Sequence, residues 1–190
     1  MIFLVGTGRR SSTTGENVDD LTSLLLPLIR EVSDFPEPGV LFRDLAPVLA
    51  DATAFRAVVD ALVVPVQRID IVVGVEARGF LLGAAVAYAL RTGVVGVRKP
   101  GKLPVVSHRE AYTLEYSVAS LELADGVLRP GQRVLVIDDV LATGGTVAAA
   151  CALVERAGAA VSGIAVLLEI GSLRGRDRLG GRSLHALLTI

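Results

Sequence analysis

Cysteine, tryptophan and methionine are nearly absent from this 190-residue chain. It contains one cysteine, one methionine and no tryptophan, and aromatic residues make up only 4% of the sequence. A single cysteine, Cys151, excludes an intramolecular disulfide and any metal site built from several thiolates. We therefore expect a cytoplasmic protein, and we expect a structural role for Cys151 because its neighbours are Ala and Val.

The sequence also lacks an excess of charge of one sign and a long apolar run. Nineteen Lys and Arg residues against twenty Asp and Glu leave a net charge of -1, which gives no overall attraction to nucleic acid or to an anionic membrane. Charged residues such as Glu76 and Arg91 interrupt the apolar stretch from Ile69 to Val97. Its longest clean run, Gly79 to Leu90, is too short to span ~30 Å of hydrocarbon. We expect neither nucleic acid nor a membrane as a partner.

Hydrophobic residues make up 52% of the chain, which is ample for a core, and the length suits one domain. The segment from Gly6 to Asp20 is polar and rich in Gly, Ser and Thr, which is typical of a mobile terminus. We therefore expect a mobile tail over residues 1–20 and a single domain over residues 21–190.

Strand and helix patterns alternate along that domain. We expect helices at residues 21–32, 52–66, 79–90 and 146–157, and strands at residues 69–75, 94–98, 133–137 and 161–169. Unbroken Val, Ile and Leu strands between helices predict an α/β fold with a mainly parallel sheet covered on both faces. Residues 100–131 interrupt the alternation, with an antiparallel strand pattern at residues 112–123, and such an insertion is often a lid.

The strongest motif runs from Val134 to Thr146. A buried strand leads into Asp138 and Asp139, and a Thr- and Gly-rich loop then opens a helix. Backbone N–H groups of such a loop can converge on a phosphate, helped by the helix dipole. Adjacent carboxylates can accept hydrogen bonds from vicinal hydroxyl groups. The motif therefore predicts a site for a ribose 5-phosphate.

This block resembles the 5-phosphoribosyl-1-pyrophosphate (PRPP) site of type I phosphoribosyltransferases. Four upstream segments are similar to those of the adenine phosphoribosyltransferase family, in that family's order: residues 35–44, 76–80, 98–104 and 112–116. The resemblance covers roughly Leu25 to the C-terminus. It implies a type I phosphoribosyltransferase fold, with a twisted sheet, an N-terminal hood and a flexible lid insertion. It also implies the reaction of adenine with PRPP to give AMP and pyrophosphate.

The resemblance assigns a role to each segment. The phosphate of PRPP or AMP would bind residues of the loop that opens the helix, namely Ala142, Thr143, Gly144, Gly145 and Thr146. The ribose hydroxyls would bind Asp138 and Asp139. Pyrophosphate would bind the cations Arg78, Lys99 and Lys102, near a non-proline cis peptide at Glu76-Ala77. Adenine would lie against Leu41, Phe42 and Arg43, although Phe42 considered alone would more simply pack in a core.

Glu115 is the expected catalytic residue. A carboxyl group held between Leu114 and Tyr116 could have a raised pKa and could hydrogen-bond purine N7 as N9 attacks the sugar. A solvent-facing strand residue would show the same spacing. Ala142 favours adenine, because 6-oxopurine enzymes of this superfamily usually carry an Asp at that point.

The family resemblance further implies a homodimer and a Mg²⁺ ion held mainly by substrate oxygens, with no direct protein ligand. Three alternatives remain open at this stage. They are a phosphoribosyltransferase for xanthine or another base, a PRPP-sensing regulator without catalysis, and a purely structural α/β subunit. A regulator would need a DNA-binding module, which the net charge of -1 and the absence of a helix-turn-helix pattern disfavour.

Overall fold

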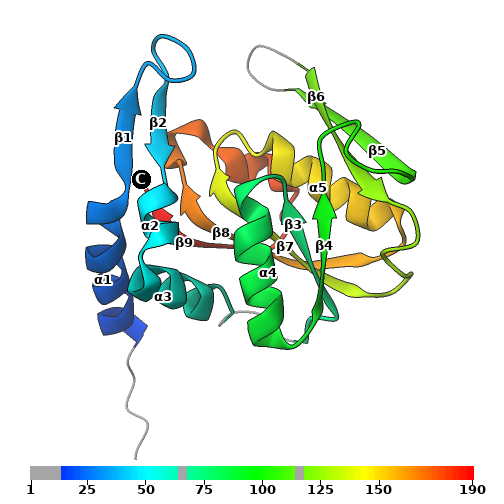
Figure 1. The fold of residues 1–190 in the computed structure, drawn as a ribbon, viewed down its shortest axis with the longest axis horizontal. Coiled ribbons are helices and arrows are strands. Elements are labelled where there is room, and N and C mark those ends of the chain that lie inside the picture. The colour runs from blue at the N-terminus through cyan, green and yellow to red at the C-terminus, as the bar shows by residue number, and fades with distance from the viewer. Residues whose placement is uncertain (1–13, 64–67, 114–117) are drawn as a thin grey trace, which may run out of the picture. The chain divides into compact units, whose positions relative to one another are not determined.

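The computed structural model describes residues 14–63, 68–113 and 118–190. The chain divides into two units, residues 1–55 and 56–190. The elements of the first unit are α1 (Thr14–Leu25), η1 (Leu26–Leu28), β1 (Arg30–Ser33), β2 (Leu41–Asp44) and α2 (Ala46–Ala50) (Figure 1). Helix α3 (Ala52–Val63) begins in this unit and ends in the next.

The first helix differs from the expected helix over residues 21–32. Helix α1 begins at Thr14, within the segment expected to be a tail, and ends at Leu25. Pro27 lies in the first turn of the short 3-10 segment that follows, and Ile29 is already extended. Residues from Arg30 onward form β1, which pairs antiparallel with β2. Proline disrupts a continuing α-helix, and pairing with β2 supplies an alternative partner for the backbone of β1.

The second unit is built on a five-stranded sheet in the order β4-β3-β7-β8-β9. All four neighbouring pairs are parallel. The strands are β3 (Ile71–Val75), β4 (Gly93–Val97), β7 (Arg133–Leu141), β8 (Ala160–Glu169) and β9 (Leu184–Thr189). The predicted parallel sheet is confirmed, and β9 is an additional strand that the sequence patterns did not predict.

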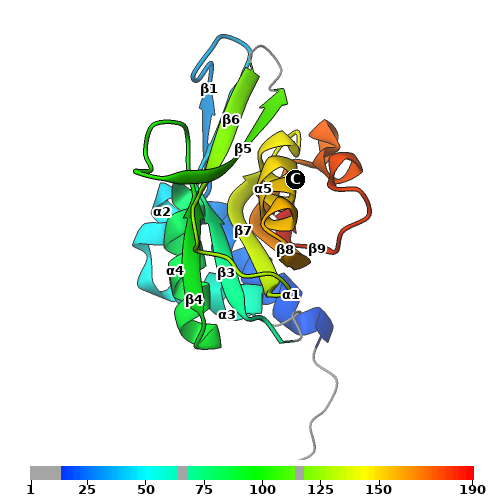
Figure 2. The ribbon, with the colours of Figure 1, turned by 90° about the vertical axis from the view of Figure 1, so that its right-hand side faces the viewer.

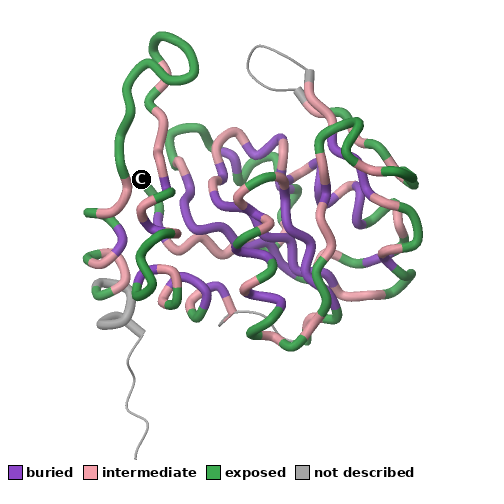
Figure 3. The backbone as a smooth tube through the Cα atoms, viewed as in Figure 1, coloured by how far each residue is buried: buried purple, intermediate pink, exposed green. Residues whose placement is uncertain are grey.

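Two helices connect the strands of this sheet. Helix α4 (Arg78–Leu90) links β3 to β4, and α5 (Gly145–Arg156) links β7 to β8. Figure 2 shows them on opposite faces of the sheet. The strands between them are almost wholly buried (Figure 3), which explains their unbroken Val, Ile and Leu sequences. The described helices include none that is long and apolar enough to cross a membrane.

Close helix packing on this sheet depends on small residues. A side-chain carbon at Gly74 would lie 2.7 Å from the carbonyl oxygen of Gly79, and one at Gly79 would lie 2.8 Å from that of Ile137. The first turn of α4 therefore lies directly against β3 and β7.

Cys151 is fully buried on α5, and burial raises the pKa of its thiol to about 12. This supports the structural role expected for Cys151.

The insertion after β4 forms a hairpin rather than a single strand. Strands β5 (Val106–Thr113) and β6 (Val118–Ala124) pair antiparallel as a separate two-stranded sheet. The hairpin packs on α5, and its Leu121 and Leu123 belong to the same buried core as the main sheet. The 3-10 segments η2 (Gly171–Leu173) and η3 (Gly175–Leu179) connect β8 to β9.

Candidate active site

The strand order places two loops side by side at the carboxyl edge of the sheet. The chain leaves β3 toward β4 on one side, and it leaves β7 toward β8 on the other side. The strand order therefore reverses between β3 and β7, which is where open parallel sheets bind ligands. The loop after β3 carries Arg78, and the end of β7 carries Asp138 and Asp139. These three predicted residues are brought together.

Arg78 and Asp139 form an ion pair across this point. The Arg78 Nε atom lies 2.5 Å from Asp139 Oδ2, and the carboxylate side chain is far more buried than the guanidinium. The Glu76-Ala77 peptide that leads into Arg78 is cis, as the family resemblance implied. A guanidinium next to two carboxylates gives the site both a cation for an oxyanion and acceptors for hydroxyl groups.

Asp138 has an unusual environment for a carboxyl group. It is 7% exposed, and its Oδ1 accepts a hydrogen bond from the backbone N–H of Asp139 at 2.9 Å. Burial, and then the neighbouring charge of Asp139, raise the pKa of Asp138 well above its usual value, although Arg78 acts in the opposite direction. The oxygens of Asp138 and Asp139 together could accept hydrogen bonds from a ribose diol.

The predicted phosphate loop follows directly. Gly144 has a φ of +80° and precedes the first turn of α5, and Ala148 N–H donates to its carbonyl at 2.9 Å. The first N–H groups of a helix lack partners within the helix, and the helix dipole adds positive potential there. Residues 142–146 therefore form the loop that leads into α5, and their role in binding a phosphate stays a prediction of the sequence motif.

A segment far along the chain supports this loop. A side-chain carbon at Gly144 would lie 2.3 Å from the carbonyl oxygen of Gly175, and one at Gly175 would lie 2.3 Å from that of Ala142. Arg176 holds the supporting segment in place, because its Nε donates to both oxygens of the buried Glu169 at 2.7 and 2.8 Å. Sequence reasoning missed Gly175, since its partners are backbone atoms thirty residues away.

The predicted cations Lys99 and Lys102 lie in an exposed turn after β4. The turn is attached to the Arg78 loop through Glu76, whose Oε2 accepts a hydrogen bond from Lys99 N–H at 2.7 Å. Burial raises the pKa of Glu76, but hydrogen bonds from Lys99 N–H and Arg98 outweigh it and lower the pKa overall. Neither lysine side chain forms an ion pair with another residue that the structure describes.

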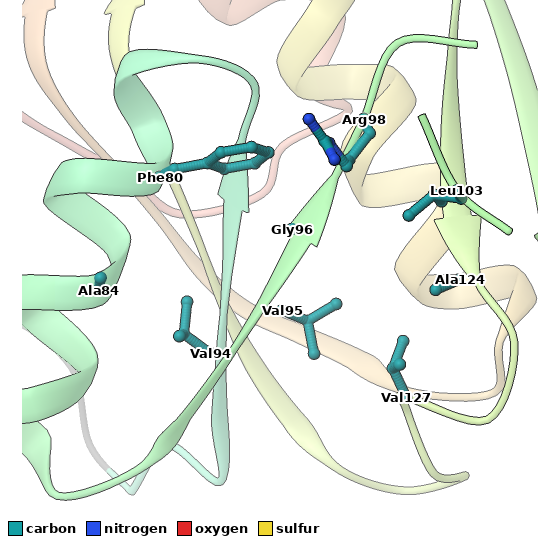
Figure 4. Close-up of a pocket in the computed structure, with 9 residues that line it drawn as sticks. All are labelled: Phe80, Ala84, Val94, Val95, Gly96, Arg98, Leu103, Ala124 and Val127. Atoms are coloured by element: carbon teal, nitrogen blue, oxygen red, sulfur yellow. The ribbon is translucent and has the colours of Figure 1, made fainter. Parts of the chain in front are cut away.

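Arg98, the third cation of this segment, is engaged with its own protein. Its guanidinium donates to Glu76 Oε1 and to the Lys102 carbonyl, both at 3.3 Å, and lies 5.7 Å from the centre of the Phe80 ring. Figure 4 shows the two side chains facing each other at one end of an apolar hollow of about 580 Å³ beside β4. Arg98 thus stabilises the base of the turn.

The residues predicted for adenine lie in the first unit, on β2. Phe42 packs edge-to-face on Phe35, with ring centroids 5.1 Å apart and an interplanar angle of 69°. Arg43 Nη2 lies 3.1 Å from Glu31 Oε1, and its Nε and Nη1 are buried without a hydrogen-bond partner. Leu41 is exposed. The predicted catalytic residue Glu115 lies outside the described residues.

Comparison with known proteins agrees with this geometry. Residues 53–182 match the family model of the phosphoribosyl transferase domain. An adenine phosphoribosyltransferase of Saccharopolyspora erythraea is 64% identical over 162 residues, which is 85% of this chain and 88% of that protein. That similarity extends well beyond the motifs of the site.

Solved structures resemble this one over nearly the same span. The adenine phosphoribosyltransferase of Rhodothermus marinus has a TM-score of 0.87 and 45% identity, covering 90% of this chain and 99% of that one. The Saccharomyces cerevisiae enzyme, complexed with adenine and an imino-altritol bisphosphate, has a TM-score of 0.84 and 34% identity, covering 90% and 99%. By sequence and by fold, this chain belongs to the adenine phosphoribosyltransferases, within the phosphoribosyltransferase family.

Proposed function

We propose that this chain transfers the 5-phosphoribosyl group of PRPP to adenine and releases AMP and pyrophosphate. Adenine N9 forms the new bond to ribose C1, the bond from C1 to the pyrophosphate oxygen breaks, and N9 loses its proton. One observation carries the proposal. The loop that opens α5, two carboxylates and Arg78 converge where the strand order of the sheet reverses. The strong similarity to adenine phosphoribosyltransferases supports adenine as the base.

The end of β7 and the start of α5 would hold the ribose 5-phosphate. The N–H groups and hydroxyls of Ala142 to Thr146 would bind the phosphate, because a left-handed Gly144 lets the chain turn sharply into the helix. Asp138 and Asp139 would bind the ribose hydroxyls. Both carboxyl groups are nearly buried, so their positions change little when the sugar arrives.

Pyrophosphate would bind on the other side of the sugar. Arg78, Lys99 and Lys102 are the cations for it, and Glu76 connects the Arg78 loop to the turn that carries the two lysines. Negative charge accumulates on pyrophosphate as the bond to C1 breaks, so fixed cations stabilise the transition state more than the bound substrate.

Magnesium would arrive with PRPP. In this proposal the Mg²⁺ ion is held mainly by substrate oxygens, and the carboxyl groups of Asp138 and Asp139 on β7 suit a divalent cation bound to the substrate. The ion would supply positive charge to the departing pyrophosphate.

Adenine would bind the hood residues Leu41, Phe42 and Arg43, and Glu115 would hydrogen-bond N7. Ala142 supports adenine over a 6-oxopurine, because no carboxylate at this position addresses the base. We further propose a homodimer and a cytoplasmic location. Exposed apolar side chains on α4 support the former, and a single buried free cysteine supports the latter.

A base panel tests the proposed function. The purified chain is incubated with PRPP, Mg²⁺ and one of adenine, hypoxanthine, guanine or xanthine, and nucleotide formation is followed by absorbance. We expect AMP from adenine and at least ~100-fold lower kcat/KM for the other bases, since a site built for one pattern of donors and acceptors rejects the others. Preferential turnover of xanthine, or no turnover of any base, would overturn the proposal.

A further inference from the structure

Glu122 is a buried carboxylate to which the proposed function assigns no role. Four buried acidic residues occur in the described part of the chain, and three of them, Asp138, Asp139 and Glu169, lie at or near the carboxyl ends of strands of the main sheet. Glu122 lies instead on β6 of the hairpin and is 1% exposed. A buried charge is costly unless it is paired and hydrogen-bonded, so its partners show what it holds together.

The two oxygens of Glu122 contact two different segments. Oε1 accepts a hydrogen bond from Arg109 Nε at 2.9 Å, and Arg109 Nη2 contacts the same oxygen. Oε2 accepts from the backbone N–H of Gly101 at 3.1 Å. The backbone of Glu122 also exchanges two hydrogen bonds with Arg98, at 2.9 and 2.7 Å. One residue thus joins β5, β6 and the turn after β4.

Gly101 lies between Lys99 and Lys102 in that turn. Two carboxylates hold alternate N–H groups of its backbone, because Glu76 accepts from Lys99 N–H at 2.7 Å and Glu122 accepts from Gly101 N–H. The side chains of both lysines remain exposed. The backbone of the turn is therefore fixed while its cations stay available to an anion.

We propose that Glu122 is a positioning residue for the pyrophosphate site. This inference rests on the proposed function, in which Lys99 and Lys102 bind the pyrophosphate of PRPP. Glu122 touches no substrate, and it acts by holding the Gly101 N–H so that the turn is ordered before the anion binds. Pyrophosphate binding then loses conformational entropy only from the two lysine side chains. Without the Glu122 contact, binding also loses the conformational entropy of the turn's backbone.

The main test compares two Glu→Gln variants of one hairpin. Glu122→Gln keeps the size of the side chain but loses the charge that attracts the Arg109 and Gly101 donors. Glu110→Gln is the matched control, because Glu110 lies on β5 and pairs with Arg156 of α5 at 2.7 Å, away from the turn. Calorimetry with Mg²⁺ and inorganic pyrophosphate, and separately with AMP, measures each Kd, and thermal unfolding measures stability.

We expect Glu122→Gln to weaken pyrophosphate binding about two- to tenfold and to raise the KM for PRPP similarly, with AMP binding within twofold of wild type. Glu110→Gln should leave all three unchanged. Lys102→Ala should weaken pyrophosphate binding by a smaller factor in the Glu122→Gln variant than in the wild type, because the two changes act through one turn. Two outcomes would show that Glu122 only stabilises the fold. One is an equal loss of affinity for pyrophosphate and for AMP, and the other is full additivity of the Glu122→Gln and Lys102→Ala effects on pyrophosphate binding.

A measurement on the unmodified protein covers the case in which Glu122→Gln does not fold. Amide hydrogen exchange at Gly101 should be slower than that of a freely exposed amide in the free protein, because the carboxylate accepts from it. Exchange at the intrinsic rate would overturn the proposal. The two proposals can fail separately, because pyrophosphate binding requires no turnover of adenine. A chain that makes no AMP would overturn the proposed function, and the effect of Glu122→Gln on pyrophosphate binding could still be measured.

Discussion

At the scale of single residues, Asp138 connects the site to the stability of the fold. Its pKa is raised in the folded protein, so the folded state binds a proton that the unfolded state releases above the usual carboxyl value of 3.8. Folding stability attributable to this group is therefore complete at low pH and is lost as the pH rises from that value through the raised pKa. The buried position of Asp138 at the proposed ribose site therefore lowers folding stability above that value.

Asp138→Asn should remove this loss. We expect the variant to gain stability relative to the wild type as the pH increases from 4 to 8, since an amide has no proton to release. Urea unfolding of both proteins without ligand, at several pH values, measures the difference. Asp125→Asn is the control, because Asp125 is exposed and directly follows β6. A stability difference that stays constant with pH would mean that Asp138 is ionised in the folded protein.

The prediction for Glu115 concerns the reaction itself. If its carboxyl group hydrogen-bonds adenine N7, Glu115→Gln should keep part of the activity because an amide still donates, whereas Glu115→Leu should lower kcat by about 10² to 10⁴. PRPP affinity should change little in either variant, because the proposed PRPP site, Asp138 to Thr146, lies in a separate segment of the chain. Steady-state kinetics with adenine and calorimetry with PRPP test this. Near-normal turnover by Glu115→Leu would leave Glu115 without a catalytic role.

At the scale of elements, the contact between the phosphate loop and the segment after β8 gives a sharp comparison. Gly144 and Gly131 have nearly the same φ, at +80° and +78°. A side-chain carbon at Gly144 meets the Gly175 carbonyl at 2.3 Å, whereas at Gly131 nothing lies within 4 Å. Replacing each glycine by alanine therefore separates backbone strain from collision.

We expect Gly131→Ala to lose about 1 kcal/mol of unfolding free energy, which is typical of the left-handed strain, and to keep the wild-type KM for PRPP. Gly144→Ala should lose more than that, and its KM for PRPP should rise at least ~tenfold because the loop must move. Urea unfolding and steady-state kinetics measure both. Identical behaviour of the two variants would argue against the contact with Gly175.

The elements differ in how well the sequence predicted them. The strands of the main sheet are continuous apolar runs, so β3, β4, β7 and β8 were located to within a few residues. The helix predicted over residues 21–32 is confirmed only to Leu25, and its second half was wrong because β1 depends on pairing with β2, which begins at Leu41. Likewise the hairpin β5–β6 was predicted as one strand, since the half-exposed Val106–Thr113 shows its pattern only against its partner.

The candidate site was predictable where its residues are consecutive in sequence. Asp138 to Thr146 form one motif, and the strand order brings Arg78 beside it as the parallel sheet implied. Glu122 and Gly175 were not predicted as parts of the site, because they act through contacts with distant backbone atoms. The sequence signal at Glu122 is a charged residue between Leu121 and Leu123, which by itself indicates no partner.

At the scale of the whole molecule, exposed apolar side chains on α4 indicate self-association. Leu81 and Tyr88 lie seven residues apart on α4, hence on one face of it, and they are 57% and 87% exposed. An almost fully exposed tyrosine next to a leucine is typical of an interface anchor. We therefore expect this face of α4 to contact a second copy of the chain.

Sedimentation equilibrium tests this expectation. The wild type should have twice the chain mass of 19.8 kDa, and Tyr88→Asp should weaken self-association at least ~tenfold, as loss of an interface anchor does. Leu173→Asp, which alters an exposed apolar residue in η2, should leave the mass unchanged. A dimer that tolerates Tyr88→Asp would place the interface elsewhere, and a wild-type monomer would contradict the dimer altogether.

The buried cysteine makes this protein well suited to site-specific fluorescence. The only native thiol is fully buried and stays protonated at neutral pH, so maleimide dyes should not react with the folded wild type. A variant such as Ala111→Cys, at an exposed position of β5, would then carry a single label on the hairpin. Emission from that label would follow the hairpin in real time while PRPP binds and pyrophosphate leaves.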